Sequence, residues 1–265
     1  METLLPQRKE KEKGVERFQG LIRKAFRIAL QLLLLSFLLF AGHSVYAYLL
    51  DDPFFCVKEV EIKGCQKIPQ EHLLSLVQME GMPNLFTIAL GEISNRLESH
   101  PWIEEVRVRK VFPDKISIQI KERKPIAILQ LEDPYYLDDK GVIFAPVGDR
   151  DGYNYPFLTG LTRQTLEREP EESKRLIMKA LELLGNLKQR RVSPLEEISE
   201  IHMEKAFGIE CFTKNEGIGV RMGWDRFGEK LRRLSIVWSD LRKRGITPVS
   251  IDCTDLKKMV VKNPS

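Results

Sequence analysis

The stretch Pro101–Ala127, PWIEEVRVRKVFPDKISIQIKERKPIA, decides how the region around it folds. From Ile116 to Ile120 every second residue is isoleucine, as in a strand that buries one face. Val106 and Val108 begin the same alternation nearer the start of the stretch. Between the two runs lies Phe112–Lys115, where proline presets its own φ and lacks a backbone donor, which favours a turn. The stretch therefore predicts two amphipathic strands that fold back on each other.

Charge is distributed unevenly along the 265 residues. The chain carries 42 Lys and Arg against 38 Asp and Glu, a formal net charge of +4. Residues 1–27 hold eight of the basic and four of the acidic residues, so all the net positive charge lies in this tail. The rest is neutral by formal count. A nucleic-acid-binding domain would carry a basic surface on its folded part, so this class of function is not supported.

Residues 28–50 form a run of 23 residues without Asp, Glu, Lys or Arg. As a helix this run would be about 35 Å long, enough to cross a hydrocarbon core of about 30 Å with some tilt. Basic residues precede it, and Asp51 and Asp52 follow it. The positive-inside rule then places residues 1–27 in the cytoplasm and everything after Leu50 outside it.

A cleaved signal peptide is the alternative interpretation of this run, because Val45–Ala47 is a tolerable small-x-small cleavage site. The 27-residue charged tail and the length of the apolar run favour a retained membrane span. Under both interpretations the bulk of the protein is exported.

Four cysteines would lie in the exported part, where disulfides can form. Cys56 and Cys65 bracket one predicted strand, and nine extended residues span about 30 Å, too far for a disulfide. Cys211 and Cys253 each lie in a predicted strand, so a cross-strand disulfide and two buried thiols both remain open. The sequence contains no C-x-x-C, the basic element of zinc and thioredoxin-type sites.

The patterns after residue 50 predict two successive α+β regions. A strand over 57–62, helices beginning at Pro69 and Ala89, and the hairpin above give the order β-α-α-β-β, with one layer of helices on a three-stranded sheet. After Pro125 the spacing predicts a mixed sheet with helices on one face. Its expected strands are 126–131, 135–137, 142–144, 197–203, 207–214, 218–222, 248–253 and 259–262, and its expected helices are 171–190 and 225–244.

With this layout, the chain resembles the FtsQ/DivIB family of bacterial cell-division proteins over nearly its full length. The family has a short cytoplasmic tail, one membrane span, a POTRA domain of β-α-α-β-β order and a second β-rich domain. The hairpin is similar to the family's POTRA signature at Pro101, Trp102, Arg109, Pro113, Glu122, Arg123 and Pro125. Thr254 and Asp255 stand where the best-known members carry Arg-Tyr, so the aromatic partner contact of those members is not carried over.

The resemblance implies an α+β protein with one transmembrane helix. Its expected parts are a basic cytoplasmic tail (1–27), a transmembrane helix (28–50), a linker (51–56), a POTRA domain (57–125), a C-terminal β-rich domain (126–262) and a short tail (263–265). It also implies the inner membrane, with the N-terminus cytoplasmic and both domains periplasmic, at the division septum.

The function that the resemblance implies is a non-catalytic scaffold of the divisome, without cofactor or metal. It would bind single-span division proteins of the FtsB and FtsL type and help recruit them to the septum. The last strand is the implied docking edge, and Lys230 and Arg233 are expected to support it with charge. The edge comprises Leu256, Lys257, Lys258, Met259, Val260, Val261 and Lys262. Taken alone, these lysines would indicate an edge strand protected against aggregation.

Two further functions remain as alternatives. A POTRA-type receptor in envelope protein transport would keep the domain and change the ligand. A membrane-tethered envelope hydrolase has less support, because the sequence contains no G-x-S-x-G, no H-E-x-x-H and no Gly-rich phosphate loop. The basic hairpin residues indicate either a surface for an acidic partner or head groups, or a solvated face balanced by glutamates. They are Arg107, Arg109, Lys110, Lys121, Arg123 and Lys124.

Overall fold

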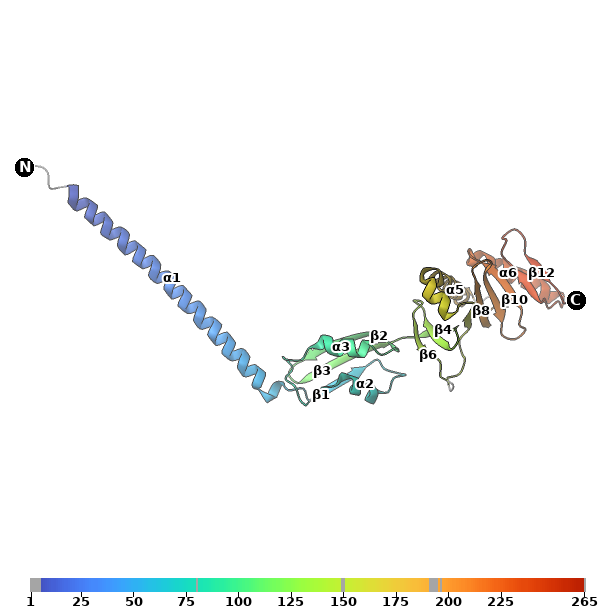
Figure 1. Ribbon diagram of the computed structural model, residues 1–265, viewed down its shortest axis with the longest axis horizontal. Coiled ribbons are helices and arrows are strands. Elements are labelled where there is room, and N and C mark those ends of the chain that lie inside the picture. The colour runs from blue at the N-terminus through green and yellow to red at the C-terminus, as the bar shows by residue number, and fades with distance from the viewer. Residues whose placement is uncertain (1–5, 80, 149–150, 191–194, 196, 265) are drawn as a thin grey trace, which may run out of the picture. The chain divides into compact units, whose positions relative to one another are not determined.

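The computed structural model describes residues 6–79, 81–148, 151–190, 195 and 197–264 (Figure 1). These residues divide into two compact units. The first unit comprises the chain up to residue 63 together with 70–96 and 107–119. The second comprises 64–69, 97–106 and the chain from 120 onward.

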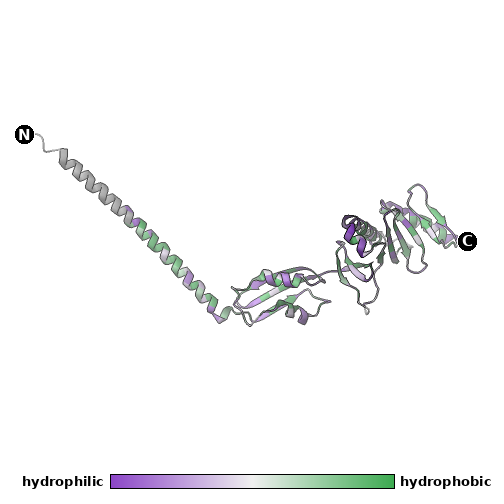
Figure 2. Cartoon of the chain, in the orientation of Figure 1, coloured by the Kyte–Doolittle hydropathy of each residue, from purple (hydrophilic) through white to green (hydrophobic). Residues whose placement is uncertain are grey.

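The chain begins with a long helix, α1 (Pro6–Asp51). Its segment Phe26–Asp51 is long and apolar enough to cross a membrane, and none of the side chains in its most apolar window is buried. Figure 2 shows hydrophobic residues predominating along this segment. An exposed apolar helix of this length fits a bilayer rather than water, in agreement with the predicted membrane span.

The β-α-α-β-β order predicted around the hairpin is present. Its elements are a short 3-10 helix η1 (Pro53–Phe55), β1 (Glu59–Lys63), α2 (Gln70–Val77), α3 (Leu90–Glu98), β2 (Ile103–Val111) and β3 (Lys115–Glu122). The three strands form one sheet in the order β1-β3-β2. β1 runs parallel to β3, with Val60 opposite Ile116 and Ile62 opposite Ile118. The alternating isoleucines of β3 are buried, as the period-two pattern predicted.

Gly64 ends β1 because no other residue fits there. Its φ is +91°, and a Cβ at this position would lie 2.0 Å from the backbone oxygen of Ile120. Glycine adopts positive φ without strain and allows this close approach of two backbones. The turn that follows β1 therefore depends on the absence of a side chain.

The second region is built on one sheet of nine strands in the order β12-β11-β10-β9-β8-β7-β4-β5-β6. Its strands are β4 (Pro125–Gln130), β5 (Pro134–Asp138), β6 (Ile143–Pro146), β7 (Phe157–Thr159), β8 (Ile198–Glu204), β9 (Gly208–Thr213), β10 (Gly219–Gly223), β11 (Ser250–Asp252) and β12 (Val260–Lys262). Its helices are α4 (Arg163–Arg168), α5 (Pro170–Arg190) and α6 (Phe227–Lys243). The predicted α+β class with a mixed sheet is thus confirmed.

The helices α5 and α6 cover one face of this sheet. Alternation along the strands divides the apolar residues between the two faces: Ala127 and Leu129 join the helix-covered core, whereas Ile128 belongs to a separate cluster on the other face. Residues from both helices complete the main core, including Leu176, Ala180, Leu183, Leu187, Leu231, Leu234, Trp238 and Leu241. One face of the sheet is therefore closed, and the opposite face carries polar residues along its C-terminal strands.

The sequence patterns did not predict β7 or α4. β7 runs parallel to both of its neighbours, with Leu158 opposite Leu129 of β4 and Ile201 of β8. This three-residue strand joins the two halves of the sheet. Parallel strands that lie between two neighbours lack a clear alternation of apolar and polar residues. A strand of three residues therefore leaves no pattern that the sequence could reveal.

Candidate partner-binding surface

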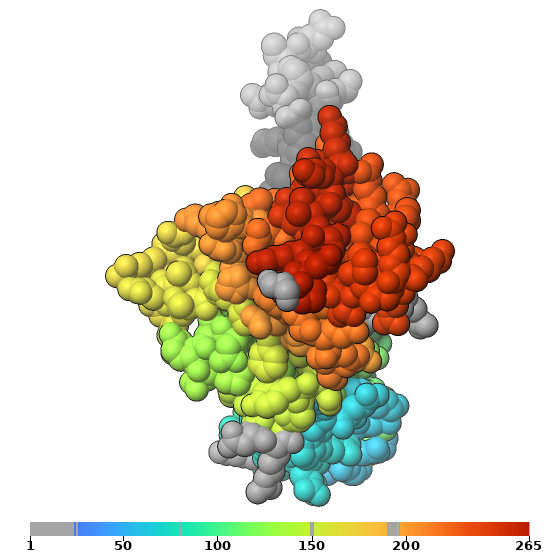
Figure 3. Space-filling view, turned by 90° about the vertical axis from the view of Figure 1, so that its right-hand side faces the viewer, coloured from blue at the N-terminus to red at the C-terminus, as the bar shows by residue number. Residues whose placement is uncertain are grey.

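β12 forms one edge of the nine-stranded sheet. It pairs antiparallel with β11, placing Val261 opposite Ile251. Val261 packs against the main core, while Val260 is 52% exposed. An edge strand leaves alternate backbone N–H and C=O groups without a partner in the sheet. Figure 3 shows the C-terminal residues lying uncovered on the face turned to the viewer.

Of the predicted docking residues, 260–262 form the strand and 256–259 form its connection to β11. Two local hydrogen bonds shape this connection. The backbone N–H of Thr254 donates to Asp252 Oδ1 over 2.9 Å, and that of Lys257 donates to Asp255 Oδ1 over 2.7 Å. Such Asx-type bonds fix tight turns. Lys257 and Lys258 are exposed on this connection, and Met259 packs against the core.

The structure does not present Lys230 as an exposed supporting charge. Its side chain is 3% exposed, and its Nζ donates to the backbone oxygen of Met222 over 2.8 Å and to Asp225 Oδ1 over 3.2 Å. Lys230 lies on the buried face of α6, where its apolar stem packs and its ammonium finds acceptors. Its expected role as a surface charge is corrected on this ground. Arg233, one turn later, is exposed.

Lys230 also lines a depression beside the edge strand. The depression is formed by Asp225, Arg226, Lys230, Thr254, Asp255, Leu256 and Lys257. It lies between the start of α6 and the connection before β12, and its lining side chains carry both signs of charge.

A row of polar residues on the uncovered face leads to this edge. Successive strand partners are His202 on β8, Glu210 on β9, Arg221 on β10, Asp252 on β11 and Val260 on β12. The Arg221 guanidinium lies 3.6 Å from the Asp252 carboxylate and 4.0 Å from that of Glu210. Sequence reasoning did not single out this row, although its members alternate with buried residues in the predicted strands.

Two signature residues of the hairpin, Trp102 and Arg123, lie where it meets the next sheet. Arg123 Nη1 lies 2.6 Å from Asp138 Oδ2, and these side chains are 16% and 2% exposed. Trp102 packs edge-to-face on Tyr136 and Phe144, with ring centroids 5.3 Å and 5.1 Å apart. We call these five residues the joint. Trp102 is half-buried and packs in the joint.

The neighbouring Glu122 supports the joint from the side of the hairpin. Its carboxylate accepts hydrogen bonds from three successive backbone N–H groups, those of residues 66, 67 and 68, over 2.8 to 3.0 Å. A carboxylate that receives several N–H groups holds a loop firmly. Pro113 lies in the hairpin turn after a cis peptide bond, Pro125 begins β4, and Arg109 is exposed on β2.

Several of the basic hairpin residues are engaged internally rather than free for a partner. Lys121 and Lys140 both bind Glu104 Oε1, over 2.9 Å and 2.6 Å. The hydrogen bond from Lys140, followed by that from Lys121, lowers the pKa of Glu104 to about 2. Lys110 Nζ donates to the backbone oxygen of Phe86 over 3.3 Å. The hairpin therefore presents a partly balanced face.

All four cysteines are free thiols in the structure. Burial raises the pKa of the Cys211 thiol well above its usual range, and burial raises that of Cys253 to about 12. The alternative of a disulfide between these two residues is therefore not the state observed. Among the described residues, no group of three His, Cys, Asp or Glu side chains is placed to hold a metal ion.

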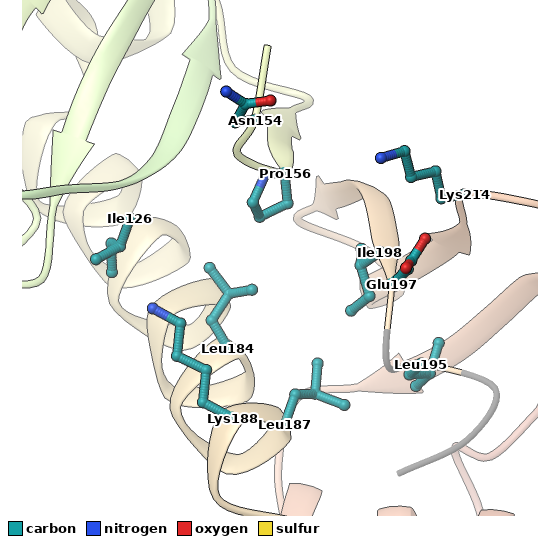
Figure 4. Close-up of a pocket in the computed structure, with 10 residues that line it drawn as sticks. All are labelled: Ile126, Asn154, Pro156, Leu184, Leu187, Lys188, Leu195, Glu197, Ile198 and Lys214. Carbon is teal, nitrogen blue, oxygen red and sulfur yellow. The ribbon is translucent and has the colours of Figure 1, made fainter. Parts of the chain in front are cut away.

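A pocket of about 640 Å³ lies beside the C-terminal half of α5 (Figure 4). Its apolar wall includes Ile126, Leu184 and Leu187, and its polar side chains include Lys188, Glu197 and Lys214. Lys188 lies on α5, whereas Glu197 and Lys214 flank β8 and β9 and are joined by a hydrogen bond from the backbone N–H of Lys214 to the backbone oxygen of Glu197 over 2.9 Å. The pocket presents an apolar hollow with a charged rim.

Comparison with known proteins agrees with this architecture. Residues 55–123 match the family described as POTRA domain, FtsQ-type, and residues 127–256 match the family described as cell division protein FtsQ/DivIB, C-terminal. The cell division protein FtsQ of Geobacter sp. strain M21 is 33% identical over 223 residues, which cover 84% of this chain and 81% of that protein.

The chain belongs to the FtsQ/DivIB family of cell-division proteins. FtsQ of Geotalea daltonii is 29% identical over 92% of this chain and 89% of its own length. FtsQ of Syntrophotalea carbinolica is 33% identical over 84% of this chain and 78% of its own length. Membership in the FtsQ/DivIB family supports a role in the cell-division machinery, and the candidate membrane helix agrees with a membrane anchor.

Proposed function

We propose that this protein is a non-catalytic scaffold of the divisome whose β12 edge receives a strand from a single-span division protein of the FtsB or FtsL type. The observation that carries the proposal is the position of β12 at the end of the sheet with Val260 exposed. In the proposed arrangement, residues 57–125 form the POTRA domain and residues 126–262 form the partner-binding domain.

Strand addition is the physical mechanism of the proposed binding. A partner strand would satisfy the free N–H and C=O groups of β12, and its side chains would contact the outward residues Val260 and Lys262. A strand of only three residues provides few main-chain hydrogen bonds, so side-chain contacts must add to the affinity. The connection before β12 and the depression beside it extend the available surface.

The charges around β12 favour an acidic partner segment. Lys257, Lys258 and Lys262 are exposed beside or on the strand, and Arg233 is exposed on α6. Opposite charges across an interface raise the association rate and exclude wrong partners. The same lysines would protect an unoccupied edge against aggregation, so protection of the free protein and attraction of an acidic partner are compatible roles.

The proposal includes an orientation of the chain in the membrane. The basic residues before the membrane helix are expected in the cytoplasm, and the two folded domains in the periplasm at the inner membrane. The partner would then bind on the periplasmic side of the membrane, at the septum.

The test is co-purification of the full-length protein with FtsB- and FtsL-type partners from the same organism. Val260→Pro fixes φ and removes the N–H that Val260 turns toward its partner Asp252 on β11, which disrupts β12 itself, so partner recovery should fall strongly. Val260→Thr keeps the β-branched shape and the N–H and serves as the matched control. Circular dichroism should show that both variants are folded. Full recovery with Val260→Pro would refute docking at this edge.

A further inference from the structure

Four phenylalanines form a continuous chain of ring contacts in the first unit. The ring centroids of Phe54 and Phe55, of Phe55 and Phe86, and of Phe86 and Phe112 are each 5.2 Å apart. The two outer members are exposed, Phe54 by 57% and Phe112 by 55%. We call these four residues the exit cluster. Its exposed rings need an explanation, because large aromatic side chains usually bury most of their surface.

The exit cluster is attached to the end of the membrane helix. The side-chain amide of Asn84, which is 7% exposed, donates to the backbone oxygens of Leu49 and Leu50 over 2.9 Å and 2.8 Å. Its Oδ1 accepts from the backbone N–H of Phe86 over 2.9 Å. The last carbonyls of α1 are thus capped by a residue from the β-α-α-β-β domain, two positions from a member of the cluster.

The segment after the helix is paired with the same loop. The backbone N–H of Leu85 donates to the oxygen of Phe55 over 2.8 Å, and that of Val57 donates to the oxygen of Pro83 over 3.0 Å. Asp52 caps the short 3-10 helix by accepting from Phe54 N–H over 2.9 Å. These hydrogen bonds hold the segment between α1 and the exit cluster in place, so it is not a flexible linker.

We propose that the exit cluster is a lipid-binding surface, with the rings of Phe54 and Phe112 inserted at the boundary between head groups and acyl chains. Phe54 follows the last residue of α1 by only three positions, so the bilayer surface is the environment that this part of the chain meets first. Aromatic rings are stabilised at this depth, where apolar side chains enter the bilayer by about 5–10 Å.

Neighbouring side chains fit the same environment. Met82 is 70% exposed in the loop that carries Asn84, and Val111 is 42% exposed beside Phe112. Lys58 is 55% exposed, so it can approach lipid phosphates while it keeps its ion pair with Asp114 at 3.3 Å. The lipid contact would hold the exit cluster at the membrane surface beside the end of α1.

The proposal is tested by tryptophan quenching with brominated lipids. Full-length Phe54→Trp and Phe112→Trp variants are placed one chain per nanodisc, in phosphatidylcholine and phosphatidylglycerol, and the parent protein supplies the background of the three native tryptophans. The matched control is Phe207→Trp, which replaces a ring of similar exposure, 61%, in the second unit.

Lipids brominated near the head group should quench the added emission at positions 54 and 112 by about half, and leave that at 207 nearly unchanged. Aqueous iodide should give the reverse order. Equal quenching at all three positions, or iodide access to 54 and 112, would overturn the proposal. Lipid quenching that is absent at one chain per disc, with protection appearing only at higher protein density, would assign the cluster to a second copy instead.

Discussion

Replacing Arg123 by leucine removes the cation from the buried ion pair of the joint. Arg123 also donates through Nε to the backbone oxygen of Pro101 over 3.4 Å and through Nη2 to that of Ile103 over 3.3 Å. Asp138, in turn, accepts from the backbone N–H groups of Lys140 and Val142 over 3.0 Å and 2.8 Å. The substitution therefore leaves a carboxylate, 2% exposed, that keeps its two turn hydrogen bonds and loses its cation.

The expected loss follows from the burial of that carboxylate. Removing one partner of a buried ion pair costs about 3–5 kcal/mol, because the remaining charge is left without compensation. The two N–H groups that Asp138 keeps place the loss near the lower limit, at about 3 kcal/mol. Asp138→Asn removes the charge but keeps an acceptor for the turn, so the double variant should recover at least about 1.5 kcal/mol relative to additivity.

The assay is urea unfolding of the full-length protein in detergent, followed by tryptophan emission, since Trp102 reports directly on the joint. Lys121→Leu is the matched control: its side chain is 61% exposed in its pair with Glu104, and such pairs contribute below about 1 kcal/mol. A loss for Arg123→Leu no larger than that of the control, or strict additivity in the double variant, would refute the reasoning.

The pKa of Glu104 is about 2 instead of its ordinary 4.5. The stability that the ionised Glu104 contributes to the fold is therefore complete above pH 4.5 and is lost as the pH falls toward 2. The melting temperatures of wild type and Glu104→Gln should differ most at neutral pH and converge in acid. A difference that grows in acid would reverse the sign and contradict this assignment. Gly64→Ala places a Cβ 2.0 Å from a backbone oxygen at φ +91°, and should lower the free energy of unfolding by at least about 1–3 kcal/mol, the cost of a strained backbone position. An unchanged free energy of unfolding would show that the loop moves away freely. Lys258→Glu combined with Lys262→Glu should slow association with an acidic partner segment and reduce its salt dependence, measured by surface plasmon resonance, whereas unchanged kinetics would exclude these charges from the interface.

The elements with a strong periodic pattern were predictable from the sequence. The membrane helix follows from an uncharged run of sufficient length, and β3 follows from its alternating isoleucines, because burial of one face imposes those patterns directly. α4 was missed because it has only six residues. Its start is nevertheless marked by a capping box, in which Thr162 and Thr165 bond each other's backbone N–H.

The candidate site was less predictable because it depends on burial and long-range contacts. Lys230 was expected to support the docking edge with its charge, although it follows Phe227 by three positions and precedes Leu234 by four, on the buried stripe of α6. Arg123 lies in the link between β3 and β4 and pairs with Asp138 at the end of β5, a long-range contact that no local pattern indicates. The edge position of β12 likewise follows from the order of all nine strands.

The most direct test of the partner-docking edge is site-specific photocrosslinking in dividing cells. A photoreactive residue at Val260, which points outward on β12, should give a crosslink to an FtsB- or FtsL-type protein. The control position is Ile143 on β6, the opposite edge of the same sheet, where that crosslink should be absent. A crosslink to the partner from Ile143 and none from Val260 would contradict the assignment of β12 as the docking edge.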